Sequence, residues 1–221
     1  MPSDLTLWQL CDSAFPAGAF AHSCGLEAAW QAGEILDIDS LRRWVATLLQ
    51  QTAAGSVPIL SASWNVPDSL AALDALCDTF LLNHVANRAS RAQGQAFLMA
   101  CVKTFDLEPL RHIADTVRQL RLPGHFAPVF GAAARHLDIA RLSACELFLF
   151  LAMRGAMSAA VRLGIVGPLQ GQKIQHEMSA SVASFVEAHT GLPPEGVTQT
   201  SPVSDLLQAM QDRLYSRLFI S

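Results

Sequence analysis

The sequence predicts an all-α protein, built as a single-domain bundle of about ten helices over residues 1–221. Three observations support this fold class. Apolar residues recur at three- and four-residue intervals along much of the chain, which is typical of amphipathic helices. No run alternates β-branched and polar residues as a half-buried strand does. The Pro- and Gly-containing turns, such as Pro16-Ala-Gly18 and Gly167-Pro168, are too short for a flexible domain linker.

The amino-terminal half contains four predicted helices. A short one runs from Gly25 to Ala32, and the next follows a cap at Asp39 and Ser40. Its apolar face consists of Leu41, Trp44, Val45, Leu48 and Leu49. A proline suits the first turn of a helix, so Pro67 begins the third, whose stripe is Leu70, Leu73, Leu76, Phe80 and Leu81. A fourth, rich in small residues, carries Val85, Ala89, Ala92, Ala96 and Met99.

The carboxyl-terminal half contains the most apolar helix, residues 142–163. Its polar residues Arg154, Ser158 and Arg162 are four apart and therefore share one face. A helix this apolar belongs inside a bundle, so we expect the arginines to be inward-facing and structural, or to line a polar passage. Another helix is predicted through Ile174, Met178, Val182 and Phe185, closed by Gly191 and Pro193-Pro194. A last one runs from Pro202 to about Tyr215.

Composition narrows the functional class. Hydrophobic residues make up 51% of the chain and charged residues 15%, so part of its surface is expected to be covered by other chains. The net charge of −4 and the lack of a Lys/Arg run argue against nucleic-acid binding. The longest uninterrupted apolar run has seven residues, too few to cross a membrane. Five scattered cysteines and no basic, apolar leader indicate reduced thiols and a cytoplasmic protein.

The sequence contains segments that resemble a phosphate-binding loop and a metal site, but each lacks residues that such a site needs. Residues 167–173 lack the glycine spacing and the Ser/Thr of a phosphate-binding loop. His22 and Cys24 are two apart and have no second ligand pair, so Cys24 is expected to be a packed thiol. The other histidines are expected at the surface or at helix caps. We therefore expect no catalytic residue, no resident metal and no cofactor.

Residues 7–27, LWQLCDSAFPAGAFAHSCGLE, resemble the opening of the UreF family of urease accessory proteins. The matching positions are Pro16, Gly18, Phe20, Ser23, Gly25, Leu26 and Glu27. Four further blocks agree in order with that family: residues 88–94, 125–131, 154–173 and the ending YSRLFIS at 215–221. The blocks span nearly the whole chain.

The resemblance implies an all-α, dimeric, non-catalytic chaperone of nickel insertion. Its partners would be the UreD-type (UreH-type) accessory protein, the GTPase UreG and apo-urease. The chain would bridge the first two and control GTP-dependent nickel delivery. The phosphate loop would belong to the GTPase, in agreement with its absence here.

The resemblance also points to residues that bind these partners. The tail over residues 200–221 would dock the UreD-type protein through Tyr215, Arg217, Leu218 and Phe219; the alternative is that the tail folds back on its own domain. An arginine beside an aromatic side chain is typical of interface hot spots. The GTPase would contact Gln170, Gln172 and Lys173. Ser23 and Glu27 would join that surface or, the interpretation we favour for Glu27, fix the first loop.

A different class of function stays open at this point, a helical enzyme similar to haem oxygenases or thiaminase-like proteins. Such an enzyme needs an early haem-ligating histidine or a buried cysteine nucleophile with neighbouring acids. His22 and Cys24 are the early candidates, and neither has these neighbours in the sequence.

Overall fold

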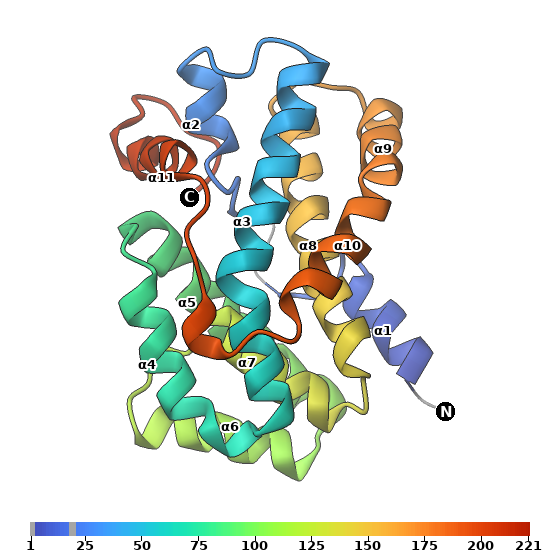
Figure 1. Cartoon of the computed structure of the whole chain (residues 1–221), viewed down its shortest axis with the longest axis vertical. Helices are drawn as coiled ribbons and strands as arrows, with labels where there is room; N and C mark the ends of the chain where they lie inside the picture. Colours follow the sequence, from blue (N-terminus) through green and yellow to red (C-terminus); the bar gives the residue numbers. More distant parts are fainter. Residues whose placement is uncertain (1–2, 18–20) are drawn as a thin grey trace.

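A computed structural model describes residues 3–17 and 21–221 of the chain (Figure 1). Within these ranges there is no strand, and the all-α prediction is confirmed with eleven α-helices. Gly18 and Phe20 of the first motif lie outside the described residues. The α-helices are α1 Ser3–Cys11, α2 Leu26–Gln31, α3 Ile38–Asn65, α4 Leu70–Phe80, α5 His84–Phe105, α6 Glu108–Gln119, α7 Phe126–His136, α8 Arg141–Arg162, α9 Pro168–Glu177, α10 Ser179–His189 and α11 Pro202–Ala209. Short 3-10 helices are η2 Pro67–Ser69, η3 Pro194–Gly196 and η4 Met210–Arg213.

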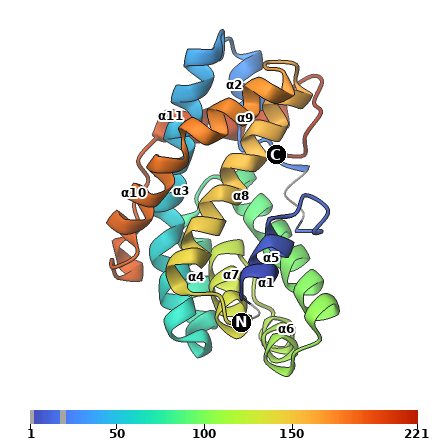
Figure 2. The same cartoon turned by 90° about the vertical axis from the view of Figure 1, so that its right-hand side faces the viewer.

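The core surrounds α7, which lies against α3, α5 and α8 (Figures 1 and 2). Nine of its eleven residues are buried. Gly131 allows α7 to approach α3 closely, since a Cβ at this position would lie 2.3 Å from the Leu60 carbonyl oxygen. Four phenylalanine rings fill the space beside it with centroids 4.9–5.6 Å apart, a separation suited to aromatic contact. They are Phe97, Phe126, Phe130 and Phe148.

The central helix α3 begins earlier than predicted and is longer. Asp37, not Asp39, is its N-cap: the Asp37 carboxylate accepts from the Ser40 amide (2.7 Å), and the Ser40 hydroxyl accepts from the Asp37 amide (2.9 Å). Pro58 lies inside the helix and has no N–H for the carbonyl four residues earlier. That carbonyl, on Ala54, instead accepts a hydrogen bond from the Thr198 amide at 3.2 Å. A segment far along the chain is thereby fixed to the middle of α3.

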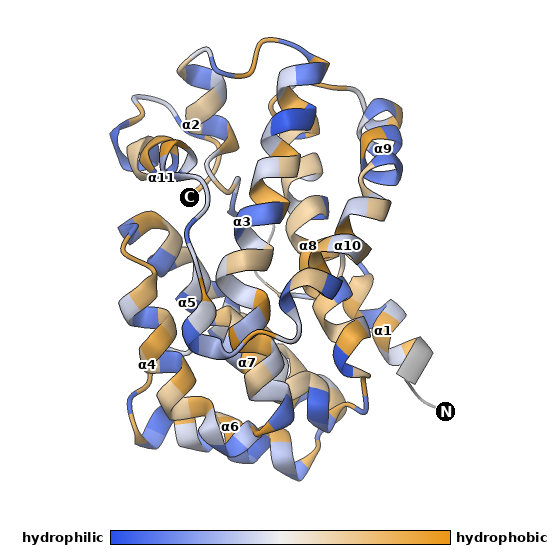
Figure 3. Ribbon diagram, in the orientation of Figure 1, coloured by the Kyte–Doolittle hydropathy of each residue, from blue (hydrophilic) through white to orange (hydrophobic). Residues whose placement is uncertain are grey.

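Helix α8 is the apolar helix expected at the centre of the bundle. By length and composition alone it could span a membrane, but 61% of its most apolar window is buried inside the structure. Figure 3 colours most of the α8 ribbon on the apolar side of the scale, while blue is frequent on the outer helix α9. This is the pattern of a core helix.

Two predicted helices in the last third have different bounds. The helix predicted through Ile174 and Phe185 is divided into α9 and α10, and the Ser179 hydroxyl donates to the His176 carbonyl (2.7 Å) where the division occurs. The last helix ends at Ala209 rather than near Tyr215 and continues as η4. After η4 the chain becomes extended at Leu214, and the following residues return to α2.

Candidate functional site

The carboxyl-terminal residues are held by the carboxylate of Glu27, which is buried in α2. One carboxylate oxygen accepts from the Leu218 amide (2.6 Å), and the other accepts from the Phe219 amide (3.1 Å) and the Gln211 side chain (2.7 Å). Hydrogen bonds to an ionised acceptor are stronger than neutral ones. Glu27 therefore has the structural role favoured from the sequence, although it fixes the tail and not the first loop.

The end of the chain also pairs with residues 21–23. The Ile220 amide donates to the Ala21 carbonyl (2.9 Å), and the Ser23 amide donates to the Ser221 carbonyl (2.5 Å). The His22 Nδ1 lies 2.5 Å from the Ser221 hydroxyl. Burial and the nearby Arg88 lower the pKa of His22, so its imidazole is neutral at pH 7.

Asp212 forms a second attachment, at the surface. Its carboxylate receives two hydrogen bonds from Arg88 (2.8 and 3.1 Å) and one from Arg217 (3.1 Å), and His84 lies 3.3 Å away. The Arg88 guanidinium contributes most to lowering the pKa of Asp212. Arg217 thus pairs with its own tail and remains about half exposed.

Apolar side chains on the same segment face solvent. On α11 and η4, Val203, Leu206 and Met210 are 67%, 68% and 44% exposed. In the tail, the exposed side chains are Tyr215, Leu218 and Ile220. We call these six residues the α11–tail patch. Exposed apolar residues concentrated on one segment are typical of a protein interface.

Three predicted partner-binding residues are not exposed. Phe219 is buried, and the guanidinium of Arg162 lies 4.3 Å above its ring centroid. The alternative that the tail folds back on its own domain therefore describes Phe219. Ser23 and Glu27 are also buried, so neither contributes to an exposed surface with Lys173. The sequence pattern did not separate these inward-facing residues from the exposed ones beside them.

The other predicted partner-binding residues lie on α9. Gln172 and Lys173 are exposed, whereas Gln170 is partly buried. Figure 1 places α9 on the opposite side of α3 from α2 and α11. The structure therefore divides the predicted residues between two separate surfaces.

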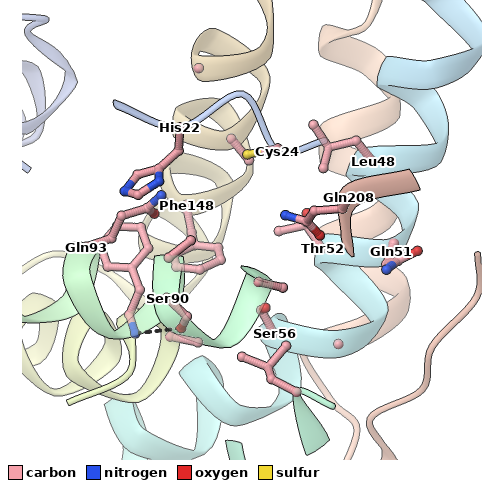
Figure 4. Close-up of a pocket in the computed structure, with 18 of the residues that line it drawn as sticks. His22, Cys24, Leu48, Gln51, Thr52, Ser56, Ser90, Gln93, Phe148 and Gln208 are labelled. Carbon is pink, nitrogen blue, oxygen red and sulfur yellow. Dashed lines mark hydrogen bonds between the residues drawn. The ribbon is translucent and has the colours of Figure 1, made fainter. Parts of the chain in front are cut away.

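A cavity of about 190 Å³ lies between α3, α5, α8 and α11. Its lining combines apolar residues such as Phe126, Phe148 and Leu151 with polar residues, and Figure 4 shows the side chains that surround it. The polar ones include His22, Cys24, Gln51, Thr52, Ser56, Gln93 and Gln208. Arg154 also lines the cavity and donates to the Cys11 carbonyl. Arg154 thus faces inward and makes a structural contact, and it is one of the polar residues on a mainly apolar cavity wall.

The cavity has no group of three or more potential metal ligands among the described residues. Burial raises the pKa of the Cys24 thiol to about 11, so it is protonated at neutral pH. This agrees with the packed thiol expected from the sequence.

Comparisons with known proteins give the family. The UreF family model matches residues 35–179. Urease accessory protein F of Oryza sativa subsp. indica is 33% identical over 216 residues, covering 96% of this chain and 83% of its own. The same-named Arabidopsis thaliana protein is 33% identical, with 97% and 91% covered, and Urease accessory protein UreF of Bacillus sp. (strain TB-90) is 29% identical, with 98% of both.

The chain belongs to the UreF family. The resemblance inferred from the motifs is thereby confirmed, and with it an accessory role in urease maturation. Two of the UreF-like blocks can be placed directly: Arg88 fixes the tail through Asp212, and Glu27 fixes it through backbone amides.

The sequence did not reveal a buried polar network in this UreF chain. His125 occupies the N-cap position of α7, one of the two places expected for it, but its side chain is fully buried; its ring nitrogens lie 3.0 Å from an Asp78 carboxylate oxygen and 3.1 Å from the Ser90 hydroxyl. Asp74 accepts from the Gly124 and His125 amides (3.0 and 2.6 Å), and Ser90 accepts from the Phe126 amide, the dashed line in Figure 4. These acceptors satisfy amides at the start of α7. The network therefore positions the core helix.

Proposed function

We propose that this UreF chain bridges the UreD-type accessory protein and the GTPase UreG during maturation of apo-urease, and acts as a cytoplasmic homodimer. It would control GTP-dependent delivery of nickel, which is cargo, and would perform no chemistry itself. The observation that carries the proposal is the α11–tail patch, six exposed apolar side chains on a segment held in a fixed conformation by Glu27 and Asp212. A pre-ordered apolar surface loses little conformational entropy when a partner binds it.

The UreD-type protein is the proposed partner of the tail. Arg217 borders the patch, and its guanidinium can exchange the Asp212 contact for a carboxylate of the partner or retain it to hold the tail in shape. Arg217→Ala is expected to weaken the complex at least tenfold in a pull-down or calorimetric titration, with an unchanged melting temperature. Arg118→Ala, which removes an exposed arginine paired within α6, is the control. Equal affinity of both variants would contradict the tail assignment.

The GTPase is the proposed partner of α9. Lys173 and Gln172 are exposed on this helix, beside Leu169, which is 87% exposed. An exposed apolar side chain with hydrogen-bond donors beside it is typical of protein–protein interfaces. Lys173→Ala is expected to reduce recruitment of UreG to the complex several-fold, while Lys103→Ala, an exposed lysine of α5, leaves it unchanged. Retained recruitment with Lys173→Ala would remove α9 from the proposal.

Activation of urease from purified parts tests the function as a whole. Apo-urease, nickel, GTP, UreG and the UreD-type protein are combined with and without this chain, and urease activity is expected to depend on it. Equal activation without the chain, together with no complex in size-exclusion chromatography, would bring back the helical-enzyme alternative. The neutral, hydrogen-bonded His22 and the protonated Cys24 favour the accessory role.

A further inference from the structure

Helix α11 departs from the usual arrangement of a surface helix. Asp205 and Gln208 face inward and line the central cavity, while Val203 and Leu206 face solvent. None of its eight residues, all within the described part of the chain, is fully buried. A surface helix normally buries its apolar stripe, and that burial provides most of its attachment. In α11 only part of this attachment is present, since Leu207 packs against the core but is partly buried.

Hydrogen bonds add to the Leu207 contact in holding α11 in place. The Gln51 side chain donates to the Asp205 carboxylate (2.7 Å), and the Asn83 side chain donates to the Asp205 carbonyl (2.9 Å) and the Gln208 side chain (3.3 Å). Water competes for each of these groups, so their net contribution is small. Burial of Asp205 raises the pKa of its carboxyl, which is a cost of closure when the group is charged.

Stronger attachments lie on either side of the helix. Before it, the Thr198 amide is bound to the Ala54 carbonyl of α3. After it, Gln211 is fully buried and bound to Glu27. Between these two points α11 passes over Gly25, where a Cβ would lie 2.9 Å from the Gln208 Cβ. These two points fix the ends of the segment between residues 198 and 211, and neither of them lies on α11 itself.

We propose that α11 is a lid over the central cavity, and that a partner docked on the outer face of α11 holds the lid closed. The second half rests on the proposed function, since it takes the UreD-type protein as the occupant of the α11–tail patch. In this patch Val203, Leu206 and Met210 are followed, after the buried Gln211, by Tyr215 and Leu218 of the tail. The partner can contact both groups at once only when α11 is in its closed position. Binding then shifts the population toward the closed form.

Cys24 provides a reporter that is already in the chain. Cys24 is partly buried and lines the cavity together with Gln208, so its alkylation should become faster when α11 moves away. Cys101 and Cys145 are buried elsewhere in the core and report opening of the whole bundle. The experiment measures alkylation of the native full-length chain by N-ethylmaleimide, quantified for each cysteine by peptide mass spectrometry.

Asn83→Asp opens the lid selectively. The new carboxylate still accepts from the Val85 and Ala86 amides at the start of α5, but it no longer donates to Asp205 and Gln208. Alkylation of Cys24 is expected to become about tenfold faster, with Cys101 and Cys145 unchanged. Gln51→Met, which removes the other donor, is expected to act in the same direction. The control is Gln95→Glu, the same change of charge on α5 at an exposed side chain bound to the Pro123 carbonyl.

The outcomes separate the two halves of the proposal. An unchanged Cys24 rate in both variants, or a parallel rise at all three cysteines, would overturn the lid. Addition of the UreD-type protein to the wild-type chain is expected to slow Cys24 alkylation several-fold. A bound partner that leaves the Cys24 rate unchanged would overturn the coupling. No binding at all would contradict the proposed function and the coupling, and would leave the lid result standing.

Discussion

Helices α7 and α11 are attached to the same bundle by different forces. Nine of eleven residues of α7 are buried, and its apolar atoms are removed from water on every side. Helix α11 has no fully buried residue and is attached through the partly buried Leu207 and the side chains of Gln51 and Asn83. Apolar burial is worth roughly 25 cal/mol per Å² and cannot be exchanged for water, whereas a hydrogen bond can. The core is therefore a fixed frame, and the carboxyl-terminal segment is a part that a partner can hold or release.

Gly94→Ala should give the largest effect, because it acts on the frame. A Cβ on Gly94 would lie 2.1 Å from the Gly124 carbonyl oxygen, where the chain enters α7. We expect a loss of about 3 kcal/mol in the free energy of unfolding, measured by urea denaturation. Gly155→Ala in α8 has no atom within 4 Å and should stabilise the protein by about 0.5 kcal/mol. Similar stabilities for the two variants would contradict the close approach at Gly94.

Glu27→Gln should destabilise the attachment of the carboxyl-terminal tail and leave the core around α7 unchanged. The glutamine side chain has one acceptor oxygen for the three donors that bind Glu27. The free energy that holds the tail in place should therefore fall by about 2 kcal/mol. Hydrogen exchange at the Leu218 and Phe219 amides should become roughly 30-fold faster, with α7 amides unchanged. Glu187→Gln, an exposed change on α10, is the control. A matching loss of protection in α7 would mean that tail and core open together.

Asp212→Asn should give the smallest effect, and one that depends on pH. The Arg88 guanidinium holds the pKa of Asp212 below its usual value, so its stabilisation is present above about pH 4 and is lost as pH falls through the lower folded pKa. At pH 7 the variant should exchange tail amides a few-fold faster than the wild type, after correction for intrinsic rates. The difference should shrink in high salt and at low pH. A difference independent of pH would assign the effect to packing.

Much of the frame could be predicted from the sequence because apolar periodicity reports burial directly. The stripe from Leu70 to Phe80 and the apolar helix around Phe148 both lie where the pattern indicates. Helix ends were less predictable because they depend on contacts with residues that are distant in the sequence. Where the last helix gives way to η4, Gln211 binds Glu27, 184 residues away in the sequence.

The candidate site could be predicted only by its residue types. Arginine, phenylalanine and glutamate in a motif do not tell which of them faces inward, and the structure exposes Arg217 while burying Phe219 and Glu27. The polar network at His125 was missed for the same reason. Its partners come from α4 and α5, and a single histidine in an apolar stretch gives no sign of them.

Pro58 has no backbone N–H, and this absence leaves the Ala54 carbonyl available to a segment from far along the chain. Restoring the amide with Pro58→Ala would give the Ala54 carbonyl a partner within α3 and make this helix more regular, the change that an engineer seeking heat resistance would choose. The restored amide would then compete with the Thr198 amide for this carbonyl oxygen. The segment around Thr198 would then have a weaker hydrogen bond to α3, and its position along that helix would be less specific. A more regular α3 would therefore leave the position of the segment after α10 less well defined.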